Sequence, residues 1–261
     1  MIKTITILTG QGKTRRPEPV RRIEMKMGNV ISIVGPTGSG KTTLINDIEL
    51  LANQNTPTGR TILINGNPPP PEYRNDPSCN PVALITQHTT FLSDLPVREF
   101  LMMHARIRNK NSDTVADLIQ RTFDFANQLT GEPIIPESKM TELSGGQTRA
   151  LLIADATVIC NTPIVLLDEV ENAGIHRTRA LELLRKYEKI FIFVTHDPRI
   201  ALLSDYRIIM KEGSIHQILH TDQAEQEFAK KVTKLDDILC TLRDQIRHGE
   251  RLNPGLMEGV L

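Results

Sequence analysis

A short stretch near the N-terminus has the residue types and spacing of a phosphate-binding loop. Its glycines frame a lysine and a threonine in the pattern G-x-x-x-x-G-K-[ST]. Glycine lets successive backbone N–H groups point at a polyphosphate, and the start of the following helix adds partial positive charge. The lysine can reach the outer phosphates, and the threonine hydroxyl can ligate Mg²⁺. The residues expected to bind the nucleotide are Gly35, Pro36, Thr37, Gly38, Ser39, Gly40, Lys41, Thr42 and Thr43.

The residues on both sides of this loop give it the context that nucleotide binding requires. Residues 30–34 are an apolar run that predicts a buried strand, and residues 43–51 carry apolar side chains at helical spacing. A strand, a glycine-rich turn and a helix together form a phosphate cradle, whereas the glycines alone would indicate only a turn. The sequence therefore predicts nucleotide binding, without saying what the nucleotide drives.

Polar groups suited to phosphate hydrolysis follow three further apolar runs. These predicted strands end at Gln87, at the paired acids Asp168 and Glu169, and at His196. Ligands gather at the carboxyl ends of parallel strands, so we expect these groups to meet the loop in one site. Asp168, Gln87 and Thr42 are expected to hold Mg²⁺ through oxygen ligands.

The same strand ends supply candidate catalytic residues, which are Glu169, His196 and Gln87. If the strand stays extended beyond Asp168, period-two alternation sends Glu169 to the opposite side, where it could activate the attacking water. His196 could contact the γ-phosphate, and the amide of Gln87 could relay the state of neighbouring helices. The alternatives are a solvated turn for the two acids and a surface or capping role for the histidine.

Strand and helix signals alternate along most of the chain. Strands are expected at residues 3–8, 22–27, 61–66, 82–86, 164–169 and 190–195, with a hairpin over 206–218. Helices are expected from residue 95, from a cap at Asn111 or Ser112, and over 148–160, 177–187 and 222–248. Residues 67–81 include four consecutive prolines, which exclude helix there and favour a stiff connector.

Composition narrows the possible partners. The 261 residues contain 31 basic and 31 acidic side chains, so no net charge draws the chain to nucleic acid. Cys79, Cys160 and Cys240 form no C-x-x-C pair and are expected to be reduced thiols. No apolar stretch is as long as a membrane span, so any membrane part is expected to come from another chain.

The order of these motifs resembles the ATP-binding cassette (ABC) ATPases. The sequence L-S-G-G-Q at residues 143–147 stands between Gln87 and the acids, and with the phosphate loop it carries a resemblance over about residues 1–219. The resemblance implies that the L-S-G-G-Q segment closes over ATP bound to a second subunit, in a head-to-tail dimer. The ATP-binding residues implied on that side are Ser144, Gly145, Gly146 and Gln147.

Three departures from the family pattern suggest an uncommon branch. Residues 1–72 contain no aromatic side chain to stack on adenine, so Arg15 or Arg16 could stack instead. Residues 170–176 differ from the segment that usually follows the catalytic glutamate. Asp155 occupies a position where the family commonly has arginine.

The resulting expectation for the fold is α/β, a P-loop NTPase of ABC type. A mostly parallel sheet is expected with an N-terminal antiparallel part, an inserted helical lobe and a C-terminal helix. Residues 1–87 and 141–219 would form the ATP-binding core, 88–140 the inserted helical subdomain and 220–261 a C-terminal helical extension. The apolar stripe of that last helix could cover the protein's own core, form a dimer seam or bind a partner.

Two roles remain open for a cytoplasmic Mg-ATP hydrolase that works as a homodimer or with a homologous second ABC subunit. The first is a soluble machine acting on a client protein complex, in enzyme activation or metallocofactor assembly. The alternative is the nucleotide-binding subunit of a membrane transporter, peripheral to the inner face of the membrane and bound to a transmembrane permease. In that case Phe91 and Leu92 are the expected apolar contacts, unless they pack inside the lobe.

Overall fold

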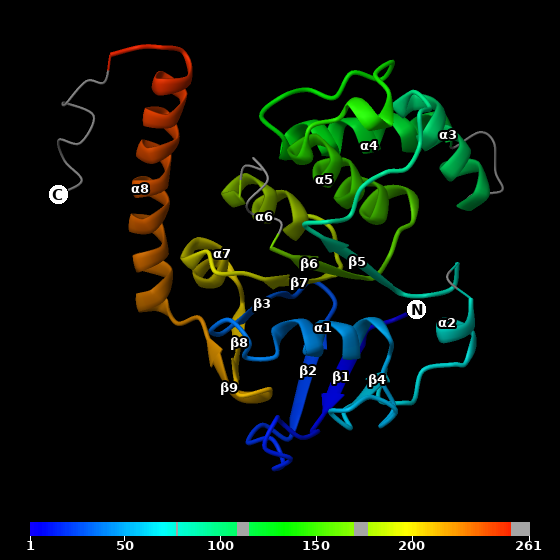
Figure 1. Ribbon diagram of the computed structural model, residues 1–261, viewed down its shortest axis with the longest axis vertical. Coiled ribbons are helices and arrows are strands. Elements are labelled where there is room, and N and C mark those ends of the chain that lie inside the picture. Colours follow the sequence, from blue (N-terminus) through cyan, green and yellow to red (C-terminus); the bar gives the residue numbers. More distant parts are fainter. Residues whose placement is uncertain (77, 109–114, 170–176, 252–261) are drawn as a thin grey trace.

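The computed structural model describes residues 1–76, 78–108, 115–169 and 177–251. Its centre is a six-stranded sheet in the order β5-β6-β7-β3-β8-β9, in which only β9 runs antiparallel to its neighbour (Figure 1). The strands are β3 (Val30–Val34), β5 (Val82–Thr86), β6 (Ile164–Asp168), β7 (Ile190–Val194), β8 (Tyr206–Lys211) and β9 (Ser214–His220). The expected mostly parallel sheet is confirmed.

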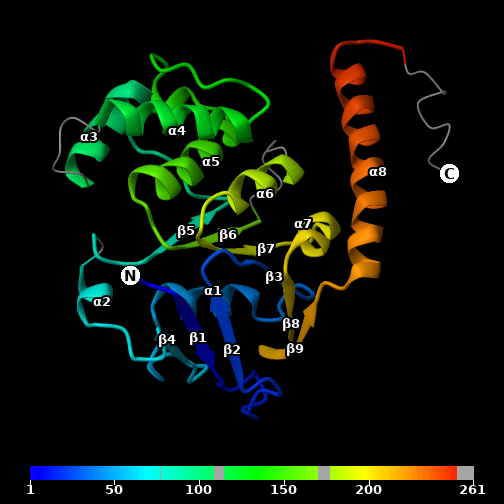
Figure 2. The same ribbon diagram turned by 180° about the vertical axis from the view of Figure 1, so that it is seen from behind.

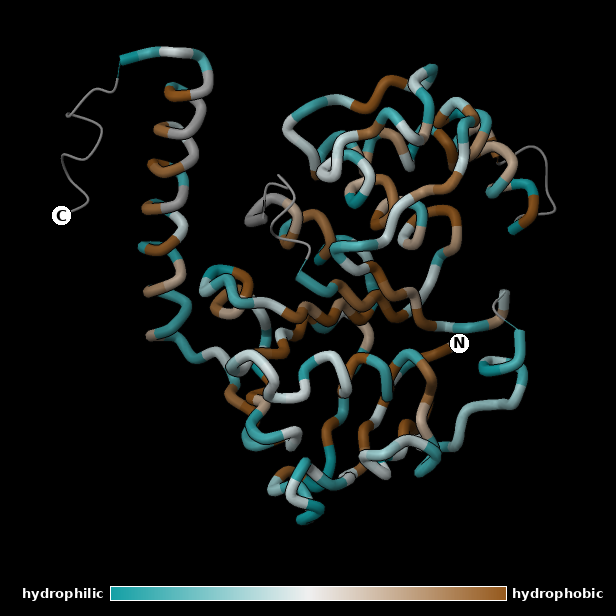
Figure 3. The backbone as a smooth tube through the Cα atoms, in the orientation of Figure 1, coloured by the Kyte–Doolittle hydropathy of each residue, from teal (hydrophilic) through white to brown (hydrophobic). Residues whose placement is uncertain are grey.

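Both faces of this sheet are covered, which explains why its strands are apolar along their length (Figure 3). In β6, Val165 and Leu167 join the core cluster on one face, whereas Ile164 and Leu166 join the cluster on the other. Helix α1 (Lys41–Glu49), which follows the phosphate loop, packs in the second cluster. Burial on both faces fixes the strand register and therefore the positions of the strand ends.

A second, three-stranded antiparallel sheet packs against α1, in the order β2-β1-β4. Its strands are β1 (Thr4–Leu8), β2 (Arg22–Lys26) and β4 (Thr61–Ile64). Ile5 and Ile7 of β1 share a core cluster with Leu44 and Ile48 of α1. The phosphate-loop helix is thus held between two sheets, and the expected N-terminal antiparallel part is confirmed.

Helices cover the opposite face of the central sheet (Figures 1 and 2). They are α3 (Val97–Arg108), α4 (Val115–Leu129), the short 3-10 helix η2 (Met140–Glu142), α5 (Gly145–Ala154) and α6 (Arg177–Arg185). One face of α4 is buried, with Val115, Ile119 and Ala126 inside. The cap expected at Asn111 or Ser112 lies outside the described residues.

Two local predictions differ from the structure. The helix expected over residues 148–160 is present, but after α5 it continues as η3 (Asp155–Ile159), a π-helical turn in which Cys160 N–H donates to Asp155 C=O at 2.9 Å. Apolar spacing alone does not reveal the extra residue of such a turn. In the connector, the short helix α2 (Glu72–Asn75) begins directly after Pro71, because proline is compatible with the start of a helix.

The C-terminal helix α8 (Gln223–Arg247) packs at its beginning against α7 (Pro198–Leu203) and then runs beside the other helices without covering the sheet (Figures 1 and 2). Its stripe does not pack against the protein's own core, because Phe228, Leu235, Leu239 and Ile246 are exposed. In the described part of the chain, no helix has both the length and the apolar character needed to cross a membrane.

Candidate active site

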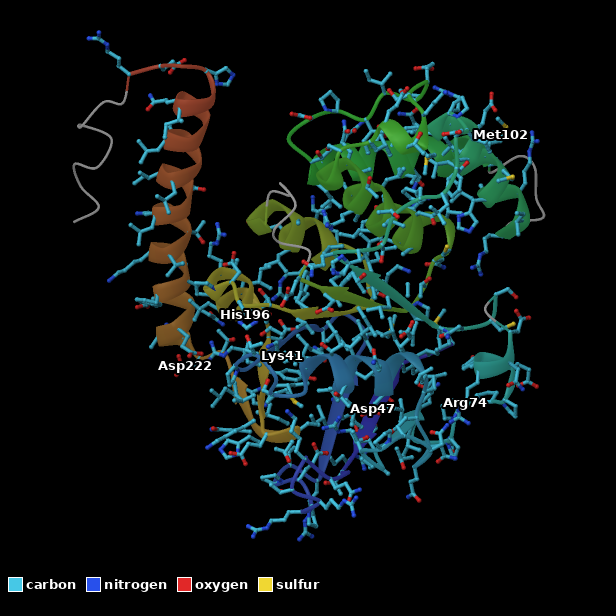
Figure 4. The ribbon with its side chains drawn as sticks, in the orientation of Figure 1. Lys41, Asp47, Arg74, Met102, His196 and Asp222 are labelled. Atoms are coloured by element: carbon cyan, nitrogen blue, oxygen red, sulfur yellow. The ribbon has the colours of Figure 1, made fainter. Side chains whose placement is uncertain are left out.

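Strand pairing brings the predicted hydrolytic residues to one edge of the central sheet. Thr86 at the end of β5 pairs with Asp168 of β6, and Asp168 pairs with Val194 of β7. Val194 in turn pairs with Ile33 of β3, two residues before the phosphate loop begins. Gln87, Glu169, His196 and the loop therefore leave the sheet from neighbouring strands, and Figure 4 shows Lys41 and His196 close together in its view.

The phosphate loop curls around the ammonium group of its lysine. Lys41 is buried, and its Nζ donates hydrogen bonds to Gly35 C=O at 2.8 Å and Pro36 C=O at 3.2 Å. A second lysine reaches the loop from the N-terminal connection between β1 and β2, where Lys13 Nζ donates to Gly38 C=O at 2.8 Å. Arg15 and Arg16 were the basic residues expected to act in that connection, and Lys13 was not predicted, because nothing in its local pattern marks it.

Two features of the loop fit a polyphosphate. Ser39 is buried, and its Oγ has no hydrogen-bond partner among the described residues. A buried hydroxyl without a partner is costly, and a phosphate oxygen would supply the missing acceptor. Gly40 has φ 97°, and a Cβ there would stand 2.8 Å from Gly213 Cα, so only glycine fits this turn. The loop backbone thus fits the role expected from the motif.

The two candidate groups for water activation lie next to each other. Glu169 Oε1 is 3.7 Å from His196 Nε2, and both side chains are partly open to solvent. The condition under which strand alternation would set the direction of Glu169 is not met, because β6 ends at Asp168. Glu169 instead has φ 50°, and its N–H donates to Val194 C=O at 3.0 Å. Such left-handed backbone in a residue other than glycine is costly and concentrates at active sites.

The candidate metal ligands combine hydroxyl, amide and carboxylate oxygens, the donors that Mg²⁺ accepts. Thr42 and Thr43 begin the exposed side of α1, Gln87 is exposed, and Asp168 is half-buried at the end of β6. Gln87 also connects two parts of the chain, because its backbone C=O accepts a hydrogen bond from Arg149 Nη2 on α5. The residue set therefore fits Mg²⁺ in its chemistry.

The L-S-G-G-Q segment stands away from this edge. Ser144 caps α5, its Oγ accepting from Gln147 N–H at 3.3 Å while Gln147 Oε1 accepts from Ser144 N–H at 2.9 Å. Gly145 and Gly146 form the first turn of the helix, and Ser144 is exposed. Since α5 lies on the face of the central sheet opposite α1, the structure does not bring this segment to its own phosphate loop (Figures 1 and 2).

A buried ionic network supports the loop from behind and was not predicted. The guanidinium of Arg60, fully buried, lies 2.6 Å from Glu18 Oε1 and 2.8 Å from Asp47 Oδ2 of α1. It also donates to Gly213 C=O at 3.0 Å, in the turn that packs on Gly40. Burial alone would lower the pKa of Arg60, but the two carboxylates outweigh it and raise that pKa, so the cation is retained.

Comparison with known proteins identifies the family. The family model described as ABC transporter matches residues 21–172. An uncharacterized ABC transporter ATP-binding protein of Methanocaldococcus jannaschii is 47% identical over 251 residues, covering 96% of this chain and 95% of that protein. The spermidine/putrescine import ATP-binding protein of Nitratidesulfovibrio vulgaris is 29% identical over an alignment 254 residues long, which covers 91% of this chain but only 64% of that protein.

A solved structure shares the fold. A dimeric ATP-binding cassette in a post-hydrolysis state, bound to ADP and Pi, superposes with a TM-score of 0.64 at 21% identity, covering 84% of this chain and 99% of that one. Residues 170–176, in which the sequence departs from the family pattern, lie outside the described residues.

The phosphate loop, the strand-end acids and the family match agree with one another. The chain therefore belongs to the ABC transporter family and is one of its ATP-hydrolysing ATP-binding domains.

Proposed function

We propose that the chain binds Mg-ATP between two subunits joined head to tail and hydrolyses it to drive conformational work on a partner. The observation that carries this proposal is the separation of two ATP-binding segments. The phosphate loop and the hydrolytic groups share one sheet edge, whereas Ser144–Gln147 is at least partly exposed at the start of a helix across the sheet. A single nucleotide that contacts both segments therefore needs a second chain. A family relative with the same fold is named as a dimer with ADP and Pi.

Within each site the residues have distinct roles. The loop N–H groups and Lys41 bind and orient the phosphates, and Thr42, Gln87 and Asp168 hold Mg²⁺, which neutralises phosphate charge when bound. Glu169 accepts a proton from the attacking water, and His196, 3.7 Å away, holds that water and the γ-phosphate in place. The opposite subunit adds the Ser144 hydroxyl and the first-turn N–H groups of α5.

The proposed partner is a transmembrane permease. The relative at 47% identity is named as an ABC transporter ATP-binding protein, and the one at 29% identity as an import ATP-binding protein. These names favour this alternative over the soluble machine, which was the first expectation. The proposed partner surface is exposed and apolar, because Leu92 is 99% exposed and Ile107 is 70% exposed. Phe91 does not contribute, since it packs on Phe100 with ring centroids 5.1 Å apart. We retain residues 88–140 as the inserted lobe that carries this surface.

Two variants test the ATP sandwich. Glu169→Gln should bind ATP, accumulate a dimer and lose hydrolysis by about a hundred-fold to ten-thousand-fold, the usual contribution of a general base. Ser144→Arg should bind ATP as a monomer but fail to dimerise, as measured by light scattering with and without ATP. Gln128→Arg, at an exposed position of α4, is the matched control and should dimerise normally. An ATP-induced dimer that persists in Ser144→Arg would exclude the head-to-tail arrangement.

The permease is tested by affinity purification of the chain from detergent-solubilised membranes. We expect one multi-span membrane protein at a stoichiometric yield, lost in Leu92→Asp. Leu50→Asp is the matched control, because Leu50 is 55% exposed but lies at the end of α1, away from the helical lobe. Recovery of only soluble proteins, with ATPase activity intact, would refute the transporter role while leaving the hydrolase assignment standing.

A further inference from the structure

A π-helical turn brings together three metal-ligating side chains far from the ATP site. Residues five apart on an α-helix point about 140° away from each other. In η3 the wider turn, closed by the bond from Cys160 N–H to Asp155 C=O, places Asp155 and Cys160 on one side of the helix. Both side chains face His104 on α3, the neighbouring helix of the lobe. Single π-turns of this kind often occur at functional sites.

The distances within this cluster suit one metal ion. Cys160 Sγ lies 3.9 Å from His104 Nε2 and 3.8 Å from Asp155 Oδ2, and one ligand atom of each residue lies within 4.8 Å of the others. Tetrahedral Zn²⁺ bonds of about 2.0 to 2.3 Å place ligand atoms about 3.3 to 3.6 Å apart. The sulfur therefore needs to approach by only a few tenths of an ångström, and no pair has to close by more than about 1.5 Å.

The cluster is also partly open to solvent. Asp155 Oδ1 is 2.9 Å from His104 Nδ1, so the two side chains already face each other. Because one carboxylate cannot hold Nδ1 and ligate the same ion as Nε2, metal binding would replace this hydrogen bond. The side chains of His104 and Asp155 are 24% and 12% exposed, and Cys160 lines a cavity of about 340 Å³. Water from that cavity can complete a four-coordinate site.

We propose that His104, Asp155 and Cys160 bind a thiophilic divalent transition metal of the Zn²⁺ class, with water as the fourth ligand. Thiolate and imidazole ligands favour such ions, whereas the all-oxygen set at the strand ends suits Mg²⁺. This proposal gives a reason for Asp155, which stands where the family commonly has arginine. A carboxylate can ligate a metal ion, whereas an arginine cannot. The ion joins α3 to the helix that begins at the L-S-G-G-Q segment.

Cobalt(II) is the probe, because a thiolate ligand gives Co²⁺ a charge-transfer band in the near ultraviolet. Co²⁺ bound by the oxygen ligands of the Mg²⁺ site would not show this band. We expect full-length protein, titrated under reducing conditions, to develop this band to a plateau near one Co²⁺ per chain and to lose it on adding Zn²⁺. Cys160→Ser should lack the band. Cys79→Ser, the matched control at an exposed cysteine in the same cavity, should retain it.

A second measurement distinguishes loss of metal binding from loss of folding in a variant. Zn²⁺ should raise the melting temperature of the parent protein and of Cys79→Ser, and a chelator should reverse the shift. His104→Gln, which keeps a polar side chain, should show no such shift while its far-ultraviolet circular dichroism matches the parent. Absence of the thiolate band in the parent protein overturns the proposal, and so does a band that survives Cys160→Ser. Neither result bears on ATP hydrolysis, which is tested separately.

Discussion

The two segments that we propose to bind ATP are built in opposite ways. The phosphate loop is supported by long-range contacts, since Arg60 joins Glu18, Asp47 and Gly213 from three separate parts of the sequence. The L-S-G-G-Q segment is held by the reciprocal bonds of Ser144 and Gln147, three residues apart, and exposes Ser144 and Gly145. The phosphate loop is fixed inside the fold. The L-S-G-G-Q segment is the start of a helix, is stabilised by local bonds and faces outward. This openness is what the proposed contact with a second subunit requires.

The sharpest way to test this contrast is to remove the network behind the loop. Arg60→Leu leaves Glu18 and Asp47 buried without a counter-charge, and we expect it to lower the free energy of unfolding by about 3 to 5 kcal/mol. Urea denaturation measures the change. Arg22→Leu is the control, because the Arg22–Glu24 pair is exposed and should contribute at most about 1 kcal/mol. Equal losses in the two variants would show that the loop has no special support.

The second prediction concerns ATP affinity, and it tests direct contact of the loop with the ligand rather than support of the loop by the fold. Lys41→Ala should weaken ATP binding by about ten-fold to a hundred-fold, because hydrogen bonds to a charged group contribute about 1.5 to 3 kcal/mol. Isothermal titration calorimetry gives the dissociation constant. Lys186→Ala, at an exposed position of the same residue type, should bind like the parent protein. Unchanged affinity in Lys41→Ala would refute the phosphate-cradle assignment.

At the L-S-G-G-Q segment, the expected loss in the free energy of unfolding is smaller. Ser144→Ala removes the cap of α5 and should lower the free energy of unfolding by about 1 kcal/mol. Ser144→Gly keeps an acceptable cap residue and should cost only a few tenths of a kcal/mol. Chemical denaturation of both variants distinguishes these values. A loss for Ser144→Ala as large as that of Arg60→Leu would mean that the segment is part of the core rather than an open surface.

The smallest effect is expected at the exposed end of the helical lobe. Leu92→Ser should change the free energy of unfolding by no more than about 0.5 kcal/mol, since that side chain is 99% exposed. Leu44→Ala, at a fully buried position of α1, should cost about 2 to 5 kcal/mol. Thermal melts of the two variants provide the comparison. A strongly destabilised Leu92→Ser would show that this residue packs within the protein and is no partner contact.

The sequence predicts well where neighbouring residues determine the structure. The strand at residues 30–34, the helix after the loop and the hairpin over 206–218 follow from local apolar patterns and turn residues. The sheet edge at which Gln87, Asp168 and His196 gather also follows, because parallel strands place their carboxyl ends together. Their roles in hydrolysis stay predictions until the variants are measured.

The features that the sequence did not reveal depend on distant residues or on small backbone changes. Arg60 contacts Glu18 at a separation of 42 residues and Gly213 at a separation of 153, and no local pattern encodes such pairs. The π-turn at 155–159 adds one residue to a helix whose apolar spacing is otherwise ordinary. Glu169 leaves the strand through a left-handed backbone angle that residue type does not favour. Function and tertiary packing determine these positions.

The close approach of Gly40 and Gly213 has a consequence for how the loop motif evolves. A Cβ at residue 40 would stand 2.8 Å from Gly213 Cα, whether or not a nucleotide is bound. A mutant library screened for folding alone, with no nucleotide present, should therefore still return glycine at position 40. By contrast, Gly38 has open space around its missing Cβ and should tolerate asparagine in that screen. Part of a motif recognised as a ligand signature is thus required by the packing of the fold itself.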